Sequence, residues 1–348
     1  MRLALLTPVY WPEVRRGTER FAHDVGAGLA RRGHSVRLVT SHRGRTTTTN
    51  EDGIEVVRVP RVPDGRLRRR LYEDHLTHVP LAARALRGEP LAHALFHTDA
   101  QAARLAKVPY VYSFMGVPHR RGLANRRGRL KLVRQAIAGA RETVVLSEAA
   151  RRAAERWLAV SPRVIHPGVD LDAFTPGGER AEVFTIVCPA ALDAPHKRAG
   201  LLLDAFARVR RERPGARLVL DRRAAAPAGP LGASGTPPGV ELRDLDDHAA
   251  LLAAYREAHV CALASEGEAF GLVLVEALAC GTPAVASGDA GGAEVTDTTF
   301  DGDDPQALAR AILEAADDDA AACRARAERF GIEQCVRAHE ALYREALR

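Results

Sequence analysis

Residues 265–287 read SEGEAFGLVLVEALACGTPAVAS, and this stretch decides how the chain is interpreted. Glu268 and Glu276 stand eight residues apart, and a helical pattern starts between them, near Gly271. The first N–H groups of a helix have no partner inside it, so they bind anions, and a glycine lets a ligand come close. We therefore predict a diphosphate site formed by four backbone N–H groups: those of Phe270, Gly271, Leu272 and Val273.

Strand and helix patterns alternate on both sides of this stretch, which predicts an α/β fold. The expected strands are 2–7, 35–41, 55–59, 91–96, 109–114, 142–147, 183–188, 216–221, 259–264 and 283–287. The expected helices are 18–32, 98–107, 126–140, 148–158, 199–212, 248–257 and 271–280, with further helices after 305. Residues 224–239, AAAPAGPLGASGTPPG, have the composition of a flexible loop.

A connector rich in glycine and proline, VIHPGVDLDAFTPGG at 164–178, divides the two α/β series. We predict an N-terminal domain at 1–165 and a C-terminal domain at 166–330, with a last helix at 331–348 that crosses back to the first domain. Each series predicts a doubly wound sheet, and ligands of such sheets bind at the carboxyl ends of the strands. We expect a cleft between the two domains.

Composition predicts a soluble protein, because 46% of the 348 residues are hydrophobic and no apolar run reaches the ~18 residues of a membrane-spanning helix. The N-terminal run MRLALLTPVYWPE reads as a buried strand rather than a signal peptide, so we expect a cytoplasmic location. The five cysteines lack the spacing of a metal or redox pair, which predicts buried free thiols. No HExxH sequence indicates a catalytic metal.

Charge is unevenly distributed along the chain. Residues 1–165 hold 31 Lys or Arg against 14 Asp or Glu, a net charge of +17, whereas 166–348 hold 19 against 30, a net charge of −11. A basic half attracts an acidic acceptor, an anionic membrane surface or nucleic acid. Few aromatic residues interleave with the basic clusters, so we expect no nucleic-acid partner. The clusters at 66–72 and 120–134 leave peripheral membrane contact open, beside the alternative of a solvated arginine-rich face.

The stretch at 265–287 resembles the paired-glutamate E-x7-E motif of the family-4 retaining glycosyltransferases. Four further segments resemble that family in order and spacing: 7–41, 166–176, 194–209 and 287–295. The resemblance covers nearly the whole chain. It implies the GT-B fold, in which two Rossmann-like doubly wound domains face each other across a cleft and the C-terminal domain holds a nucleotide-sugar donor.

The resemblance also implies roles for individual residues. Glu268 contacts the transferred sugar and Glu276 binds the ribose hydroxyls. Lys197, one of only three lysines, neutralises the leaving diphosphate, and Gly17 approaches the donor from the opposite domain. Three residues at 291–294 close the donor pocket: Gly291, Gly292 and Glu294.

Three departures from the family pattern stand out. Gly17-Thr18 replaces a glycine pair. Ala191 stands where the family has an arginine, and Arg198 is our candidate to supply that charge. Met115 stands where the family has a histidine beside the reacting sugar. A thioether donates no hydrogen bond, so the candidates to replace that histidine are His97 and His119.

We therefore expect a retaining glycosyltransferase that moves a sugar from a UDP- or GDP-linked donor to a small polar acceptor, such as a secondary metabolite. By this resemblance it needs no metal and no other cofactor. Three alternatives stay open: a membrane-surface transferase with a lipid or lipopolysaccharide acceptor, a phosphorylase or epimerase on the same fold, and a catalytically silent nucleotide-sugar-binding subunit. The donor base and sugar, the acceptor and the oligomeric state stay unassigned.

Overall fold

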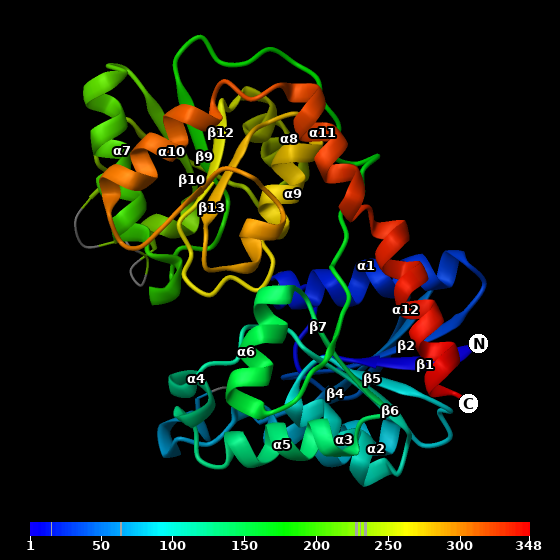
Figure 1. The fold of residues 1–348 in the computed structure, drawn as a ribbon. Coiled ribbons are helices and arrows are strands. Elements are labelled where there is room, and N and C mark those ends of the chain that lie inside the picture. The colour runs from blue at the N-terminus through cyan, green and yellow to red at the C-terminus, as the bar shows by residue number, and fades with distance from the viewer. Residues whose placement is uncertain (15, 63–64, 227–228, 230, 233–234) are drawn as a thin grey trace. The chain divides into compact units, whose positions relative to one another are not determined.

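The computed structural model describes residues 1–14, 16–62, 65–226, 229, 231–232 and 235–348. The chain forms two compact units. The N-terminal unit comprises Met1–Gly168 and Ile332–Arg348, and the C-terminal unit comprises Val169–Gly331. Gly168 lies within the glycine- and proline-rich connector at 164–178. Figure 1 shows one sheet with its helices in each unit.

The N-terminal sheet has the strand order β3-β4-β2-β1-β5-β6-β7-β8, in which β3 alone pairs antiparallel among the described strands. The strands are β1 (Arg2–Leu6), β2 (Ser35–His42), β3 (Thr47–Glu51), β4 (Ile54–Pro60), β5 (Ala92–Ala94), β6 (Tyr110–Phe114), β7 (Glu142–Val145) and β8 (Arg163–Val164). Successive side chains of a strand point to opposite faces. Leu3 and Leu5 accordingly enter one core cluster, and Ala4 and Leu6 enter another.

Helices cover both faces of this sheet (Figure 1). The helices are α1 (Gly17–Arg31), α2 (Val79–Ala85), α3 (His97–Ala106), α4 (Arg120–Ala124), α5 (Arg129–Gly139), α6 (Glu148–Leu158) and the C-terminal α12 (Ile332–Ala346). The helix α12 packs on α1, and Gly28 makes this close approach possible. A Cβ atom at Gly28 would lie 2.5 Å from a methyl carbon of Val336.

The C-terminal sheet is parallel throughout its described strands, in the order β11-β10-β9-β12-β13-β14. The strands are β9 (Thr185–Cys188), β10 (Arg217–Asp221), β11 (Val240–Arg243), β12 (Val260–Leu263), β13 (Ala284–Ser287) and β14 (Thr299–Phe300). The helices are α7 (Ala199–Glu212), α8 (His248–Glu257), α9 (Leu272–Ala279), α10 (Pro305–Ala315) and α11 (Ala320–Ala327). This strand order is that of a Rossmann sheet.

Every strand and helix expected from the sequence is present, and the expected α/β class is confirmed. The pattern missed β3, β8, β11, β14, α2 and α4, all of which are short. A 3-10 turn at Arg222–Ala225 runs into the start of the expected loop 224–239, of which 227–228, 230 and 233–234 lie outside the described residues. The five cysteines are buried and free, as predicted, and burial raises the pKa of the Cys188 thiol to about 11. Among the described residues, the helices are too short or too polar to cross a membrane.

Candidate functional site

Two loops of the C-terminal unit start side by side at the centre of its sheet. The strands β9 and β12 are parallel neighbours, and the chain continues from β9 toward β10 and from β12 toward β13. This reversal of strand order is the position at which open α/β sheets bind ligands. The loop 189–198 leaves the carboxyl end of β9, and the loop 264–271 leaves that of β12.

The structure brings the predicted Lys197 and Glu268 together at this point. Lys197 Nζ donates to Glu268 Oε2 over 2.6 Å, and the two side chains remain 19% and 18% exposed. The backbone joins the same loops, since Glu266 N–H donates to the His196 carbonyl over 2.8 Å. A charge-assisted hydrogen bond between partly exposed groups holds the carboxylate and the ammonium ready for a ligand.

The helix α9 begins directly after this pair. Gly271 is its N-cap residue, with φ +93°, a backbone conformation that L side chains avoid. The N–H groups of Leu272 and Val273 fall in the first turn, where a helix offers them no internal partner. Phe270 lies one step before the helix, with its ring buried edge-on against Phe330 at 5.2 Å. The structure thus places the predicted amides at one helix start, and their contact with a diphosphate stays a prediction.

A 3-10 turn at Gly291–Glu294 closes the far side of the Glu268 loop. Gly291 N–H donates to the Glu268 carbonyl over 2.8 Å. A Cβ atom at Gly291 would lie 2.3 Å from the Ala269 carbonyl oxygen, which leaves no room for a side chain there. Gly291, one of the residues predicted to close the donor pocket, therefore helps to fix the backbone of the loop that carries Glu268.

Glu276 lies one turn further along α9 and is buried, with 1% of its surface exposed. Tyr255 on α8 donates its hydroxyl hydrogen to Glu276 Oε2 over 2.6 Å. This bond fixes the direction of the carboxylate that the resemblance assigns to the ribose. Tyr255 could not be found from the sequence, because no local signal connects a tyrosine on one helix with a glutamate 21 residues later.

Arg198 uses its guanidinium to join the carboxyl ends of three strands. Its Nε donates to the Ala264 carbonyl over 2.6 Å, and its Nη2 donates to Ser287 Oγ over 3.2 Å. Its Nη1 donates to the Gly302 carbonyl and to Asp303 Oδ1. The structure thus places Arg198 at the site as a clamp on the sheet edge. Ala191 stands where the family has an arginine, and the role of Arg198 as the substitute for that positive charge stays a prediction.

Ser265 is a further polar residue of this edge that the sequence analysis missed. It follows β12 directly and is 1% exposed, and its hydroxyl has no hydrogen-bond partner among the described residues. Buried hydroxyl groups are nearly always hydrogen-bonded, so an unpaired one beside a ligand loop is a candidate ligand contact.

The other predicted residues lie in the N-terminal unit. Gly17 starts α1, and a Cβ atom there would meet nothing within 4 Å. Met115 follows β6 and packs against the core cluster that contains Leu3. His119 caps α4, where its exposed ring accepts the Gly122 N–H at Nδ1 over 3.2 Å.

His97 has a different environment from His119, since it is buried at the start of α3. Its Nε2 lies 3.2 Å from Glu73 Oε1, and Arg129 also donates to the Glu73 carboxylate. Burial raises the pKa of this carboxyl, but the neighbouring His97 and Arg129 side chains outweigh burial and lower the pKa to about 2. Glu73 is therefore ionised at neutral pH and faces the imidazole.

In the described part of the chain, no group of three or more His, Cys, Asp or Glu side chains is arranged to hold a metal ion. The polar groups at the carboxyl edge of the C-terminal sheet are instead an ammonium, two carboxylates and helix-start amides. Together they offer positive and hydrogen-bonding groups to a diphosphate and acceptors to sugar and ribose hydroxyls.

Comparison with known families matches the two halves of the chain separately. Residues 15–173 match the family described as "Glycosyltransferase Family 4", and residues 183–318 match the family described as "Glycosyl transferases group 1".

Curated relatives match a shorter stretch. The D-inositol 3-phosphate glycosyltransferase of Segniliparus rotundus is 35% identical over 150 residues, which is 38% of this chain and 33% of that protein. The enzyme of the same name from Mycolicibacterium smegmatis is 36% identical over 146 residues, which is 36% of this chain and 31% of that protein. The matched stretch spans about a third of the length of these relatives.

Solved structures match the fold over nearly the full chain. The sucrose-phosphate synthase from Thermosynechococcus elongatus has a TM-score of 0.80 at 19% identity, covering 99% of this chain and 98% of that one. Anabaena HepE in complex with UDP and glucose has a TM-score of 0.72 at 17% identity, covering 99% of each chain.

Proposed function

The chain belongs to the family-4 glycosyltransferases and has the GT-B fold, and from this premise we propose that it transfers a sugar from a nucleoside-diphosphate donor to a hydroxyl group of a small polar acceptor. We further propose that the transfer retains the anomeric configuration and needs no metal ion. The observation that carries the proposal is the Lys197–Glu268 pair at the strand-order reversal, directly before the start of α9.

Lys197 supplies the fixed positive charge for the diphosphate in this mechanism. When a donor binds, its diphosphate takes the ammonium as a partner, and Glu268 is released to accept hydrogen bonds from the sugar. The first-turn amides of α9 add the partial positive charge of a helix N-terminus. Charge on the leaving diphosphate is then met by groups that need no reorganisation, and one such preorganised donor contributes ~2.7–4 kcal/mol to transition-state stabilisation.

Retention follows if the acceptor attacks on the face from which the diphosphate leaves. The bond between the anomeric carbon and the phosphate oxygen breaks, and a bond to the acceptor oxygen forms on the same face. The proton of the acceptor hydroxyl passes to the leaving phosphate oxygen, so no second carboxylate is needed as a nucleophile. Isolation of a covalent sugar adduct on this protein would contradict this mechanism.

The donor base is best tested first as uracil. A structural neighbour was solved with UDP and glucose, and it shares the fold over nearly the whole chain. Glu276, held by Tyr255, is the residue proposed to bind the ribose hydroxyls. These hydroxyls are common to all ribonucleotides, so this contact leaves the choice between UDP and GDP to the rest of the pocket.

We propose that the small polar acceptor carries a phosphate. The curated relatives act, by name, on D-inositol 3-phosphate, and the N-terminal half of this chain carries a net charge of +17. A basic domain raises the local concentration of an anionic acceptor. Polyol and sugar phosphates are therefore the first acceptors to test.

The deciding experiment measures thermal stability with UDP, GDP, ADP, TDP and CMP in the presence of a chelator. A ligand at 100 times its dissociation constant adds ~2.7 kcal/mol of stability. We expect one diphosphate to raise the melting temperature of the wild type, and Lys197→Ala to abolish that rise. The control Lys131→Ala removes an exposed lysine of the other unit and should keep the full shift.

Three outcomes would count against the proposal. If no nucleotide shifts the wild type at millimolar concentration, the donor site is wrongly placed. If a diphosphate binds but no sugar is released or transferred with any acceptor, the chain is a nucleotide-sugar-binding subunit without activity. Donor turnover that needs inorganic phosphate, or that needs no acceptor, would indicate a phosphorylase or an epimerase.

A further inference from the structure

Two basic segments that are far apart in the sequence lie together in the N-terminal unit: residues 66–72 and 120–134, here called the basic patch. Arg127 N–H donates to the Leu71 carbonyl over 2.6 Å, and the Arg127 guanidinium lies over the Tyr72 ring at 5.8 Å. Arg129, in the second segment, also donates to the carboxylate of Glu73, which directly follows the first segment. Both segments therefore contribute to one continuous surface.

The charge of the basic patch has one sign. Its two segments contain ten arginines and one lysine and no aspartate or glutamate. Arg129 is paired with Glu73, whereas Arg120, Arg121 and Lys131 are exposed. Surfaces of folded proteins usually mix both signs, so a surface with one sign indicates an anionic partner.

Two large, mainly apolar side chains of the basic patch are exposed beside its arginines. Leu71 is 51% exposed and Tyr72 is 39% exposed. Leu71 has φ +63°, a conformation that costs a leucine free energy, and the turn is closed by Tyr72 N–H donating to the Leu67 carbonyl over 3.0 Å. Strained backbone conformations concentrate at functional positions. Here the strained turn carries exposed apolar groups between arginines.

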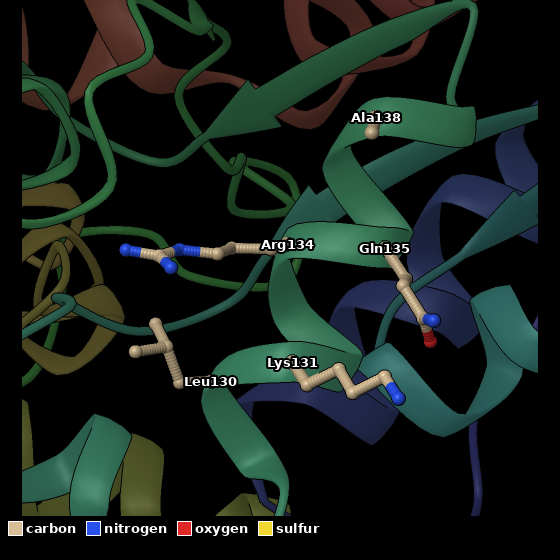
Figure 2. A pocket seen from close by; sticks show the side chains of 5 residues that line it. All are labelled: Leu130, Lys131, Arg134, Gln135 and Ala138. Carbon is tan, nitrogen blue, oxygen red and sulfur yellow. The ribbon is translucent and has the colours of Figure 1, made fainter.

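A shallow depression of about 510 Å³ adjoins the patch along α5. Figure 2 shows Leu130 and Arg134 extending to one side of the helix and Lys131 and Gln135 to the other. With Ala138 these side chains line a mostly apolar floor that carries two cations. Such a floor can accommodate the apolar part of an amphiphile while the cations meet its anionic group.

From these observations we propose that the basic patch binds the surface of an anionic lipid bilayer. Leu71 and Tyr72 enter the headgroup layer while the arginines pair with lipid phosphates, a combination that binds more strongly than charge alone. The patch has a single tyrosine and no other aromatic residue, so it lacks the row of stacking rings with which proteins hold single-stranded nucleic acid. This proposal does not depend on the proposed transferase activity.

The experiment measures sedimentation of the full chain with vesicles of phosphatidylcholine alone and of phosphatidylcholine mixed with phosphatidylglycerol. We expect binding to the mixed vesicles, with weakening as salt is raised, because exposed charges are screened over about 10 Å at 0.1 M salt. An arginine near such a surface contributes about fivefold in affinity, so Arg120→Glu with Arg121→Glu should reduce binding at least about tenfold. Leu71→Ser with Tyr72→Ser should also weaken it.

Matched controls separate the patch from net charge and from general apolarity. Arg84→Glu with Arg87→Glu changes the charge equally at two exposed arginines of the same unit, and Leu347→Ser removes an exposed leucine at the C-terminus. Both controls should bind the mixed vesicles as the wild type does. Melting temperatures of all variants establish that each is folded.

Leu71→Trp gives a direct readout of insertion, because indole fluorescence shifts to the blue when the ring leaves water. We expect that shift with mixed vesicles only. Equal binding to neutral vesicles, wild-type binding by the patch variants, or binding of single-stranded RNA without binding of anionic vesicles would overturn the proposal.

Discussion

Lys197 Nζ and Glu268 Oε2 lie 2.6 Å apart, and the two residues come from loops that follow different strands of the C-terminal sheet. Each charge is therefore neutralised by the other when no ligand is present. A bound diphosphate has to compete with Glu268 for the ammonium, whereas the sugar of a complete donor engages the released carboxylate. The nucleotide and the sugar are therefore expected to bind different members of the pair: the diphosphate binds Lys197 and the sugar binds Glu268.

Glu268→Gln should separate the two functions. The neutral amide no longer competes for Lys197, so UDP or the equivalent diphosphate should bind several-fold more tightly than to the wild type. The loss of a preorganised charge at the sugar should lower kcat by about 10²–10³. Calorimetry with the diphosphate and steady-state kinetics with the full donor measure the two effects. Weaker binding of the bare diphosphate would contradict this account of the pair.

Tyr255→Phe should weaken binding of nucleosides but not of pyrophosphate. The change removes the O–H that holds Glu276, and a hydrogen bond to a charged group contributes about 1.5–3 kcal/mol. We expect KM for the donor to rise about tenfold with kcat nearly unchanged, because the ribose does not take part in bond breaking. An equal loss of affinity for inorganic pyrophosphate would show that Tyr255 supports the whole site rather than Glu276.

The placement of Glu268 before a helix could be predicted because one local segment carries the signal. Glu268 and Gly271 stand within four residues, so their spacing alone places a carboxylate before a helix start. The sequence could not predict the partner of Glu276, because Tyr255 reaches it from another helix through tertiary packing. The same holds for the bonds of Arg198, which join residues up to 105 positions away.

Arg198→Lys distinguishes a structural clamp from a ligand. A lysine keeps the charge but cannot bridge three strand ends, which needs the planar fork of the guanidinium. We expect the melting temperature to fall and UDP binding to weaken in parallel, and chemical denaturation should show a stability loss of about 1–3 kcal/mol for the part-buried hydrogen bonds to Ala264 and Ser287. A lysine variant of wild-type stability that binds UDP less well would instead identify Arg198 as a ligand contact, which supplies the charge of the family's arginine at position 191.

The strands missed by the sequence analysis share one physical property. The strands β8 and β14 contain two residues each, and β3 is a polar edge strand, TTTNE. Such segments bury too little apolar surface for a period-two pattern to show, and they form because a neighbouring strand offers hydrogen bonds. The central strands were predictable because both of their faces are buried.

His339 predicts how stability depends on pH. It is fully buried, and burial lowers its pKa from 6.5 to about 4. It lies 5.6 Å from the ring of His93, another buried imidazole whose pKa is also lowered by burial. Because the folded protein binds these protons less readily than the unfolded chain does, their contribution to stability is present above pH 6.5 and is lost as the pH falls toward 4.

The variant His339→Phe should reduce this acid sensitivity. One proton fewer is taken up on unfolding, so the slope of the unfolding free energy should fall by at most about 1.4 kcal/mol per pH unit between pH 6.5 and 4. Urea unfolding at several pH values measures the slope. His119→Asn, which changes an exposed histidine, should leave the slope as it is in the wild type. An unchanged slope in His339→Phe would show that other groups cause the acid sensitivity.

His97 is the better candidate to replace the histidine missing at Met115, because its ring is held by an ionised carboxylate. Glu73, with its pKa lowered to about 2, keeps the imidazole in one orientation, whereas His119 is exposed and uses Nδ1 as a helix cap. We expect His97→Asn to lower kcat by about a hundredfold, the lower end of the loss caused by removing one preorganised hydrogen-bond donor, with little change in donor KM. We expect His119→Asn to change kcat less than about twofold.

A stability effect has to be separated from this loss, because His97 is buried. Glu73→Gln serves that purpose, since it keeps the shape of the side chain but removes the charge that faces His97. If His97 acts in catalysis, this variant should keep the wild-type melting temperature to within a few degrees and retain part of the activity, because the imidazole is still present but its ionic partner is gone. If His97 only supports the fold, Glu73→Gln and His97→Asn should lower the melting temperature together, and their losses of activity should follow their losses of stability.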